Sequence, residues 1–499
     1  MKNHRYFVYL LSFVMLLLFT SCAKLDVVPP DQLSTTGFWK SPNDADLALA
    51  GLYNFLYSSS NCGWGYGQYE VMFWDNFSDD GYSSDDYGGG NTACHSGLTP
   101  LTGQFQSAYY DNCYQMIAAC NSFLANVDKV LSGTQLSQYK AEAYFLRGFN
   151  YYWLAILYGN VPIVTADPMT IPASTKMATS PRTDVLAQVE SDLNAAIANL
   201  PDVAYSSGHA VKSTAEGYLV RTYLFEKKWA QAATLSNAII SSGLYSLNPN
   251  YAYNFYKPEQ NSSNEIMFSV KYLLPNLQHP YVALAVSLDS WSELQGTQDL
   301  INEYETGDPR KTMTWFMPGD TKAQGWPWDG SSSVYTPGYS GAYYCTAGFY
   351  MQKKWLTPGI TDPVYGTLDD NDIVLLRYAD IKLMYAEAQN EAVGADASVY
   401  QQVNDVRARV GMSPLAAGLS QTAMRAAIWH ERRVEFAAEG LRYFDLRRWG
   451  ITAQKLNGVA KNPLTPSITS VYKSNYDYWP IPQGEIDRNA PVMEQNPGY

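Results

Sequence analysis

Apolar residues recur at helical spacing along most of the chain. Residues 43–58 are predicted to form a helix, with Ser41 as the N-cap and with apolar residues at Ala45, Leu47, Leu49, Leu52, Phe55 and Leu56. Longer runs with the same periodicity predict helices over residues 105–130, 136–158 and 184–200. The pattern therefore predicts a mainly α-helical protein.

Two segments look like helical hairpins. Residues 213–242 contain two apolar-periodic arms joined at Lys227-Lys228-Trp229 and closed by Gly243. Residues 373–393 and 399–410 form a second candidate pair. Arms of this length resemble tetratricopeptide units, but no strict 34-residue period is present, so we interpret them as degenerate repeats.

Two stretches depart from the helical pattern. Residues 58–103 are rich in Gly, Ser, Asp and aromatic residues, and residues 272–370 are rich in Trp and Tyr. Loops of this length inside a compact protein are usually functional. We predict a signal peptide over residues 1–21 and one domain over residues 22–499, with 58–103 and 272–370 as loop-rich insertions.

The N-terminus has the features of an export signal. Lys2 and Arg5 precede an apolar run from Tyr6 to Phe19, which is shorter than the roughly 20 residues that span a bilayer. The small residue before Cys22 predicts lipidation of that cysteine, which would anchor the mature protein to a membrane. Phe19 departs from the usual leucine, and an ordinary cleaved signal is the alternative.

Charge excludes some partners. The formal net charge of −13 becomes about −15 once Lys2 and Arg5 are removed, which argues against nucleic acid. An uncharged or cationic ligand fits this charge better.

The cysteines suggest few covalent links. Cys62 and Cys94 bracket one loop region and are the disulfide we would choose in an exported protein. Cys113 and Cys120 are separated by roughly 10 Å of helical rise, which is too far to bridge.

Enzyme signatures are absent from the sequence. His430-Glu431 is not followed by the second histidine of a metalloprotease helix, and no nucleophile elbow or phosphate loop occurs. Carboxylate pairs occur at 79–80, 85–86 and 369–370, and we interpret them as solvated loop residues, with a structural calcium site and acid–base catalysis as alternatives. We predict a protein that is not an enzyme and that has no cofactor or catalytic metal.

The most charged segment lies near the C-terminus. Half of the residues from Glu431 to Arg448 are charged, in a chain that is 16% charged overall. On one helix, Glu431, Glu435 and Glu439 would form a stripe, with Arg432 and Arg442 three residues from a glutamate. The segment is also apolar, so we predict a buried helix whose charges are paired, and not a basic nucleic-acid surface.

This segment resembles the late signature of the SusD/RagB family, nutrient-binding outer-membrane lipoproteins of Bacteroidetes. The similar residues are 431–433, 439–442 and 444–450, and further matches occur at 142–147, 158–162, 376–388, 404–409, 479–485 and 495–499. The resemblance covers the mature chain in order. It implies four degenerate tetratricopeptide-type hairpins that support an irregular, loop-rich half.

Aromatic residues in the loops are the candidate ligand contacts. A sugar ring needs flat side chains against its C–H face and polar groups for its hydroxyls. The helical tyrosines at 144, 151, 152, 218 and 223 are predicted core residues. The predicted ligand residues share a position in the two loop-rich stretches: Trp64, Tyr66, Tyr82, Asp85, Asp86, Tyr87, Trp291, Trp326, Trp328, Tyr335 and Tyr339. Stacking on ligand competes here with loop packing and with contact to a partner protein.

The resemblance implies a function as well as a fold. We expect a lipoprotein on the outer face of the outer membrane that captures an oligosaccharide or polysaccharide. It would pass the glycan to a SusC-like TonB-dependent transporter, and the helical face would contact that partner. A peptide or another nutrient as ligand is one alternative, and a surface glycoside hydrolase is another.

Overall fold

The structure is a computed structural model, and it describes most of the helical chain. The described residues are 38–57, 74–82, 97–101, 104–278, 294–317, 349–355, 357, 369–461, 469–470 and 472–499. Within them the chain is mainly helical, as the sequence predicts.

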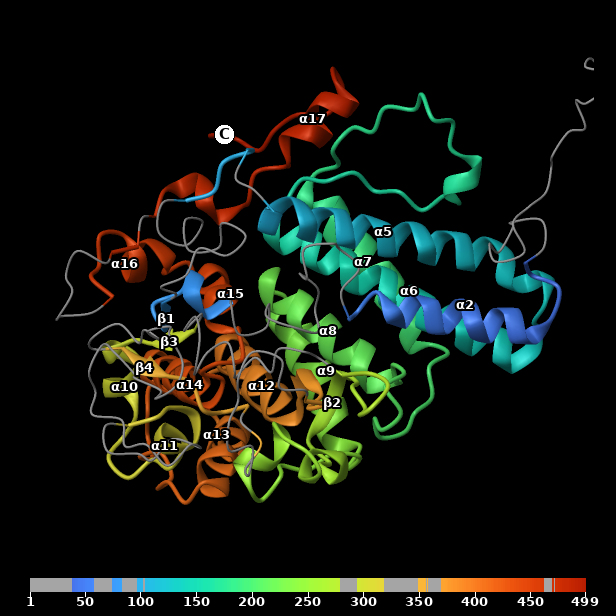
Figure 1. Ribbon diagram of the computed structural model, residues 1–499. Helices are drawn as coiled ribbons and strands as arrows, with labels where there is room; N and C mark the ends of the chain where they lie inside the picture. Colours follow the sequence, from blue (N-terminus) through green and yellow to red (C-terminus); the bar gives the residue numbers. More distant parts are fainter. Residues whose placement is uncertain are drawn as a thin grey trace, which may run out of the picture.

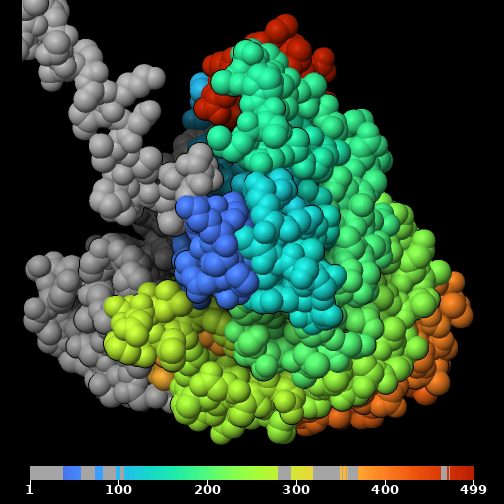
Figure 2. All heavy atoms as spheres, turned by 90° about the vertical axis from the view of Figure 1, so that its right-hand side faces the viewer, coloured from blue at the N-terminus to red at the C-terminus, as the bar shows by residue number. Residues whose placement is uncertain are grey.

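Four helices form the first part of the molecule (Figure 1). They are α2 (Pro42–Asn54), α5 (Gln104–Asn126), α6 (Gly133–Leu157) and α7 (Arg182–Ile197). The amides of Lys40 and Ser41 donate to the Asp44 carboxylate, which caps α2. In Figure 2, α2 is the blue segment and lies against the cyan segment. Helix α6 is buried almost all round from Ala141 to Leu157, because its neighbours cover every side.

The predicted hairpin at 213–242 is confirmed. Helices α8 (Lys212–Phe225) and α9 (Trp229–Ser241) pack against each other, and Lys227 and Gly243 adopt positive φ at the two reversals. Helix α9 packs on α12 (Tyr378–Ala392), which also contacts α13 (Ala397–Arg409) and α14 (Gln421–Glu435). This contact joins the two halves of the helical body.

The segment predicted as a helix over residues 373–393 begins with a strand. Residues Ile373–Arg377 form β5, which pairs antiparallel with β2 (Ile266–Val270). The amide of Tyr378 donates to the carbonyl of Glu265, and α12 starts at that residue. The prediction of a helix from residue 373 was wrong, because pairing with a strand distant in sequence was not visible locally.

The loop-rich stretches also contain ordered structure. Strands β1 (Gly81–Tyr82), β3 (Gln295–Gly296) and β4 (Tyr350–Met351) form a small sheet in the order β1-β3-β4. Short helices α10 (Gln298–Glu303) and α11 (Arg310–Thr314) follow β3. Trp315 and Trp355 are buried, so part of the 272–370 stretch belongs to the core.

The C-terminal segment returns to the first helices. Helices α15 (Arg442–Trp449), α16 (Thr452–Leu456) and α17 (Gln483–Asn489) are followed by an ordered tail, in which the Asn496 amide donates to the carbonyl of Trp479. The Trp479 amide donates in turn to the carbonyl of Leu157 at the end of α6. Short 3-10 helices complete the described elements: η1 (Trp74–Phe77), η3 (Val127–Lys129), η4 (Pro168–Thr170), η5 (Tyr251–Asn254), η6 (Glu259–Ser262) and η8 (Ser474–Asp477).

Three further predictions concern the core and the membrane. Cys113 and Cys120 are both free and buried, as their helical separation predicted. Tyr151, Tyr152 and Tyr218 are buried core residues, whereas the other two helical tyrosines are half-buried. In the part of the chain that the structure describes, no helix is long and apolar enough to cross a membrane.

Candidate functional site

The structure brings the two loop-rich stretches together at one sheet, which we call the loop platform (β1, β3 and β4). Tyr82 pairs with Gln295, and Gln295 pairs with Met351. Residues 83–96 follow β1, residues 279–293 precede β3 closely, and residues 318–348 precede β4. The two loop-rich stretches are therefore attached to adjacent strands, β1 and β3, which are more than 200 residues apart in sequence.

Tyr82 is the predicted ligand residue that the described chain includes. It is half-buried, and its ring stacks on Phe349 with centroids 4.6 Å apart. This contact joins the first loop-rich stretch to the second. The other predicted ligand residues lie outside the described residues: Trp64, Tyr66, Asp85, Asp86, Tyr87, Trp291, Trp326, Trp328, Tyr335 and Tyr339. Cys22, Cys62 and Cys94 lie outside them as well.

A polar pocket of about 230 Å³ lies beside the loop platform. Its lining includes Asp299, Gln454 and Lys455, which carry acceptor and donor groups, and Leu456, which is apolar. Lys461, also in the lining, donates to the carbonyl of Gly81 in β1 at 2.7 Å. A pocket with this mixture of groups can take sugar hydroxyls and present a small apolar surface.

Sequence reasoning did not find these pocket residues. Gln454 and Lys455 follow the charged signature by only a few positions, in a short helix with no recognisable motif. Asp299 lies in the first turn of α10, where an acidic residue is common in any helix. Their proximity depends on the tertiary fold.

A larger groove of about 580 Å³ runs between α2 and α5 and has a different character. Phe38, Trp39 and Phe123 give it aromatic walls. Its polar groups are used internally: Asn126 accepts from Lys129, and Asp167 accepts from the amide of Met169. Polar groups of the polar pocket are also used internally, since Asp299 accepts from Arg433 at 2.7 Å, so the two sites differ mainly in the aromatic walls of the groove.

Buried ion pairs join the residues just before β1 to helices α14 and α15. Arg442 donates two hydrogen bonds to Asp79, at 2.8 and 2.9 Å, and Arg433 donates to Asp80 at 2.7 Å. Burial alone would raise the pKa of Asp79, but the charges of Arg433 and Arg442 hold it well below its ordinary value. The interpretation of Asp79 and Asp80 as solvated loop residues was wrong, because each has an arginine partner more than 350 residues away in sequence.

The carboxylate pair at 369–370 was also predicted to be solvated, and this too was wrong for the buried Asp369. Asp369 is buried and accepts hydrogen bonds from the side chain of Asn371 and the amide of Asp370. Asp370 is half-buried and accepts from the amide of Leu274. Within the described residues, no group of three or more His, Cys, Asp or Glu side chains is arranged to hold a metal ion.

Most of the charged segment is buried and paired, as predicted, with Arg447 as an exception, but the segment is not one helix. Helix α14 ends at Glu435 and α15 begins at Arg442, with Ala438 and Gly440 at positive φ between them. This turn exposes backbone carbonyls to the second loop-rich stretch. Lys354 donates to the carbonyl of Ala437, and Trp355 donates to that of Ala438, both at 2.9 Å.

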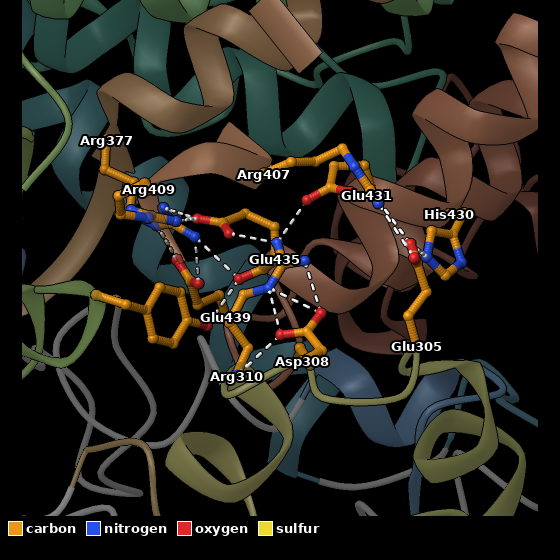
Figure 3. Close-up of polar contacts among 12 residues, drawn as sticks. Glu305, Asp308, Arg310, Arg377, Arg407, Arg409, His430, Glu431, Glu435 and Glu439 are labelled. Atoms are coloured by element: carbon orange, nitrogen blue, oxygen red, sulfur yellow. Dashed lines mark hydrogen bonds and ion pairs between the residues drawn. The ribbon is translucent and has the colours of Figure 1, made fainter. Parts of the chain in front are cut away.

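Glu435 is the centre of the network (Figure 3). Arg310 donates to its carboxylate at 2.9 Å and Arg377 at 2.6 Å, and Arg409 is a third partner. Burial alone would raise the pKa of Glu435, but these guanidiniums hold it far below its ordinary value. The three arginines come from α11, the end of β5 and α13, so one carboxylate joins three elements to α14.

The other glutamates also bind arginines from outside the segment. Arg310 donates to Glu431 at 2.6 Å, and Arg377 donates to Glu439 at 2.7 Å (Figure 3). The predicted partners, Arg432 and Arg442, are directed elsewhere: Arg432 binds Asp380 and Asp445, and Arg442 binds Asp79. The predicted pairs of Arg432 with Glu435 and of Arg442 with Glu439 were wrong. The turn at 436–441 breaks the helical spacing between Glu439 and Arg442, and Glu435 is held by arginines from other elements.

Comparisons with known proteins agree with this architecture. A family model described as the SusD family matches residues 223–499. The chain belongs to the SusD/RagB family. A second model, described as starch-binding associating with outer membrane, matches residues 68–224.

SusD-like relatives cover nearly the whole chain. SusD-like protein P2 of Formosa agariphila is 25% identical over 98% of this chain and 99% of its own length. A SusD-like carbohydrate binding protein from Bacteroides fragilis has a TM-score of 0.78 at 25% identity, covering 90% of this chain and 99% of its own. Surface glycan-binding protein A from Bacteroides thetaiotaomicron, solved with laminarihexaose, has a TM-score of 0.73 at 21% identity and covers 91% of this chain and 99% of its own.

The fold explains why the family signature contains so many charged residues. Arg377 and Asp380 come from the matching stretch at 376–388, and Arg407 and Arg409 from that at 404–409. All four bind carboxylates or arginines of the charged segment from Glu431 to Arg448. In this SusD-like protein, the signature residues form the scaffold beneath the loop platform.

Proposed function

We propose that this SusD-like protein captures oligosaccharide at the cell surface and delivers it to a SusC-like TonB-dependent transporter. Membership of the SusD family carries this proposal. Convergence of the loop-rich stretches on one sheet supports it, because aromatic residues of both stretches are attached there. The polar pocket next to that sheet supplies groups suited to hydroxyls.

Binding without catalysis is part of the proposal. The buried carboxylates at 79 and 435 hold guanidiniums and are committed to the scaffold. A glycosidase needs two carboxyl groups facing each other across a cleft, one of them available as an acid. The relative from Bacteroides fragilis is described as a carbohydrate binding protein, which is consistent with capture and release.

The N-terminal signal completes the proposed role. Lipidation of Cys22 would hold the mature chain at the outer membrane, on the exterior face. The helices that cover the first part of the molecule are the proposed contact with the transporter. A Cys22→Ala variant should then be released from the membrane fraction while it keeps its glycan affinity.

The decisive experiment changes the paired indoles of the second loop-rich stretch. A double Trp326→Ala, Trp328→Ala variant should lose about tenfold or more in glycan affinity, since stacking contributes roughly 0.5–1.5 kcal/mol per aromatic ring beyond burial and two rings are lost. Glycan-array screening followed by calorimetry would measure it, with laminarihexaose as the first probe. Tyr253→Ala, at an exposed aromatic outside both stretches, is the matched control.

The outcomes separate the alternatives. Unchanged affinity in the double variant would remove this pair from the site. An array without a glycan hit, together with binding of peptides, would replace the glycan by another nutrient. Release of shorter products from a polysaccharide would contradict a binding role.

A further inference from the structure

Two neighbouring arginines differ from every other arginine in the described chain. Arg182, the first residue of α7, and Arg447, in α15, have no carboxylate within ion-pair distance among the described residues. The remaining described arginines are all ion-paired: 147, 221, 310, 377, 407, 409, 425, 432, 433, 442, 448 and 488. The exceptions occur side by side in a strongly acidic protein.

Both guanidiniums lie against the same aromatic ring. The Cζ atoms of Arg182 and Arg447 are each 5.7 Å from the ring centroid of Tyr478. The ring is fixed in place, because a Cβ atom on Gly159 would lie only 2.8 Å from its Cδ1 atom. Tyr478 is half-buried, so the two cations meet at a place where solvent or a ligand can reach.

The hydrogen-bonding capacity of this cluster is only partly used. Nε and Nη1 of Arg447 are buried and have no partner among the described residues. Nε of Arg182 donates to the carbonyl of Ala155, and its own amide donates to the side-chain oxygen of the exposed Asn160. Buried donors are normally satisfied, so an unsatisfied guanidinium in a folded protein suggests a missing acceptor.

The electrostatics point to the same kind of acceptor. Burial lowers the pKa of Arg182 from its ordinary value and the nearby charge of Arg447 acts in the same direction, while Tyr478 and the carboxylate of Glu226, which is not within ion-pair distance, oppose them only in part. The α7 N-terminus adds the positive end of a helix dipole beside Arg182. An anion at this place would offset the repulsion between the two cations and accept their free N–H groups.

We infer that Arg182, Arg447 and Tyr478 form a binding site for an oxyanion substituent of the glycan, either a carboxylate or a sulfate ester. Guanidinium groups match both oxyanions with parallel hydrogen bonds. This inference deepens the proposed function and rests on it, because it names an acidic glycan as the ligand class.

The position of the site favours a glycan as the source of the anion. Arg442, at the start of α15, holds Asp79 below the loop platform, and Arg447 lies five residues further along the same helix. That separation is roughly 8 Å along the helix axis. Helix α15 therefore carries both an arginine that holds Asp79 next to the loop platform and an arginine of the proposed oxyanion site.

The test compares acidic and neutral sugars at constant ionic strength. Glucuronate and galactose 6-sulfate should bind the mature protein more tightly than glucose and galactose in calorimetric titrations. Arg182→Gln and Arg447→Gln should each weaken the acidic sugars by about tenfold or more, since a charge-assisted pair is lost. Arg425→Gln, which removes an arginine already paired with Glu391, should leave binding unchanged.

Further measurements guard against a folding defect. Each glutamine variant is unfolded in urea beside the wild type, and Arg182→Lys and Arg447→Lys keep the charge without the planar fork. Partial recovery of acidic-sugar binding in the lysine variants supports the site. Equal binding of the acidic sugars by wild type and both glutamine variants overturns it.

Two more results would also overturn the inference. If inorganic sulfate binds while the acidic sugars bind no better than neutral ones, the site holds an adventitious ion only. If laminarihexaose binds and neither sulfate nor the acidic sugars do, the oxyanion site is wrong while glycan capture stands. Loss of neutral glycan binding with acidic-sugar binding retained would instead contradict only the broader proposal of neutral glycan capture, and would support this site.

Discussion

Two groups of arginines in this protein differ in what surrounds them. Around Glu435, the guanidiniums of Arg310 and Arg377 are buried and hold carboxylates on every side (Figure 3). At Tyr478, Arg182 and Arg447 are half-buried and have no carboxylate partner in the described chain. The first group looks more like an active site in the sequence, yet it is the scaffold.

The difference teaches that density of charge is a poor guide to a ligand site. Taking paired charges out of water costs roughly as much as their attraction returns, so a buried network fixes geometry more than it adds stability. Its carboxylates are held by guanidiniums and are therefore not available to a ligand. Unused donors near the surface are the more informative feature.

Removing an arginine from the network around Glu435 should have the largest effect on stability. Arg377→Met should lower the free energy of unfolding by about 3–5 kcal/mol, because Glu265, Glu435 and Glu439 lose a buried partner together. Urea denaturation and the yield of exported protein would measure this. Arg425→Met, at a partly exposed pair, is the control, and a loss at Arg377 of less than about 1 kcal/mol would show that the network is not needed.

The next largest effect is expected where the network meets the loop platform. Arg442→Ala should cost about 3 kcal/mol, since buried Asp79 loses two hydrogen bonds. Folding or export should suffer, while the folded fraction keeps the glycan affinity of the wild type. Calorimetry on the folded fraction would show this, and a selective loss of affinity would move Arg442 from the scaffold into the site.

A partly exposed ion pair should give the smallest effect. The hydrogen bond to Glu142 raises the pKa of His209, although burial opposes it. The folded pKa exceeds the ordinary value of about 6.5, so the stabilisation is complete below that pH and is lost as pH rises through the folded pKa. After screening by solvent it should amount to less than about 0.5 kcal/mol.

Unfolding measurements between pH 5.5 and 8 would resolve this effect. His209→Gln should flatten the pH dependence relative to the wild type, because the variant has no proton to bind. A wild-type protein that becomes more stable with rising pH over this range, by an amount that His209→Gln abolishes, would contradict the sign.

Local patterns were enough to predict much of the helical body. The hairpin of α8 and α9, the burial of Tyr151 and Tyr218, and the free state of Cys113 and Cys120 follow from helical periodicity and rise. The burial of the charged segment also followed from its mixture of apolar and charged residues. These properties depend on residues that are near one another in sequence.

The candidate site was predicted less completely. Tyr82 was chosen for its loop context and does lie on the loop platform, but the pocket residues Asp299, Gln454 and Lys455 carried no signal. The sequence likewise gave no indication that Arg182 and Arg447 would lack carboxylates. Pairing between groups several hundred residues apart depends on how the chain closes on itself.

By itself, then, the sequence determined the helices, the family and the burial of its signature, because these depend on local spacing and on apolar surface that has to leave water. The tertiary structure decided which arginine meets which carboxylate, that residues 373–377 pair as a strand, and that the two loop-rich stretches share one sheet. A charged side chain or a strand can pair with any suitable partner, so the sequence alone does not select one. Only the folded chain selects among the many partners that the sequence offers.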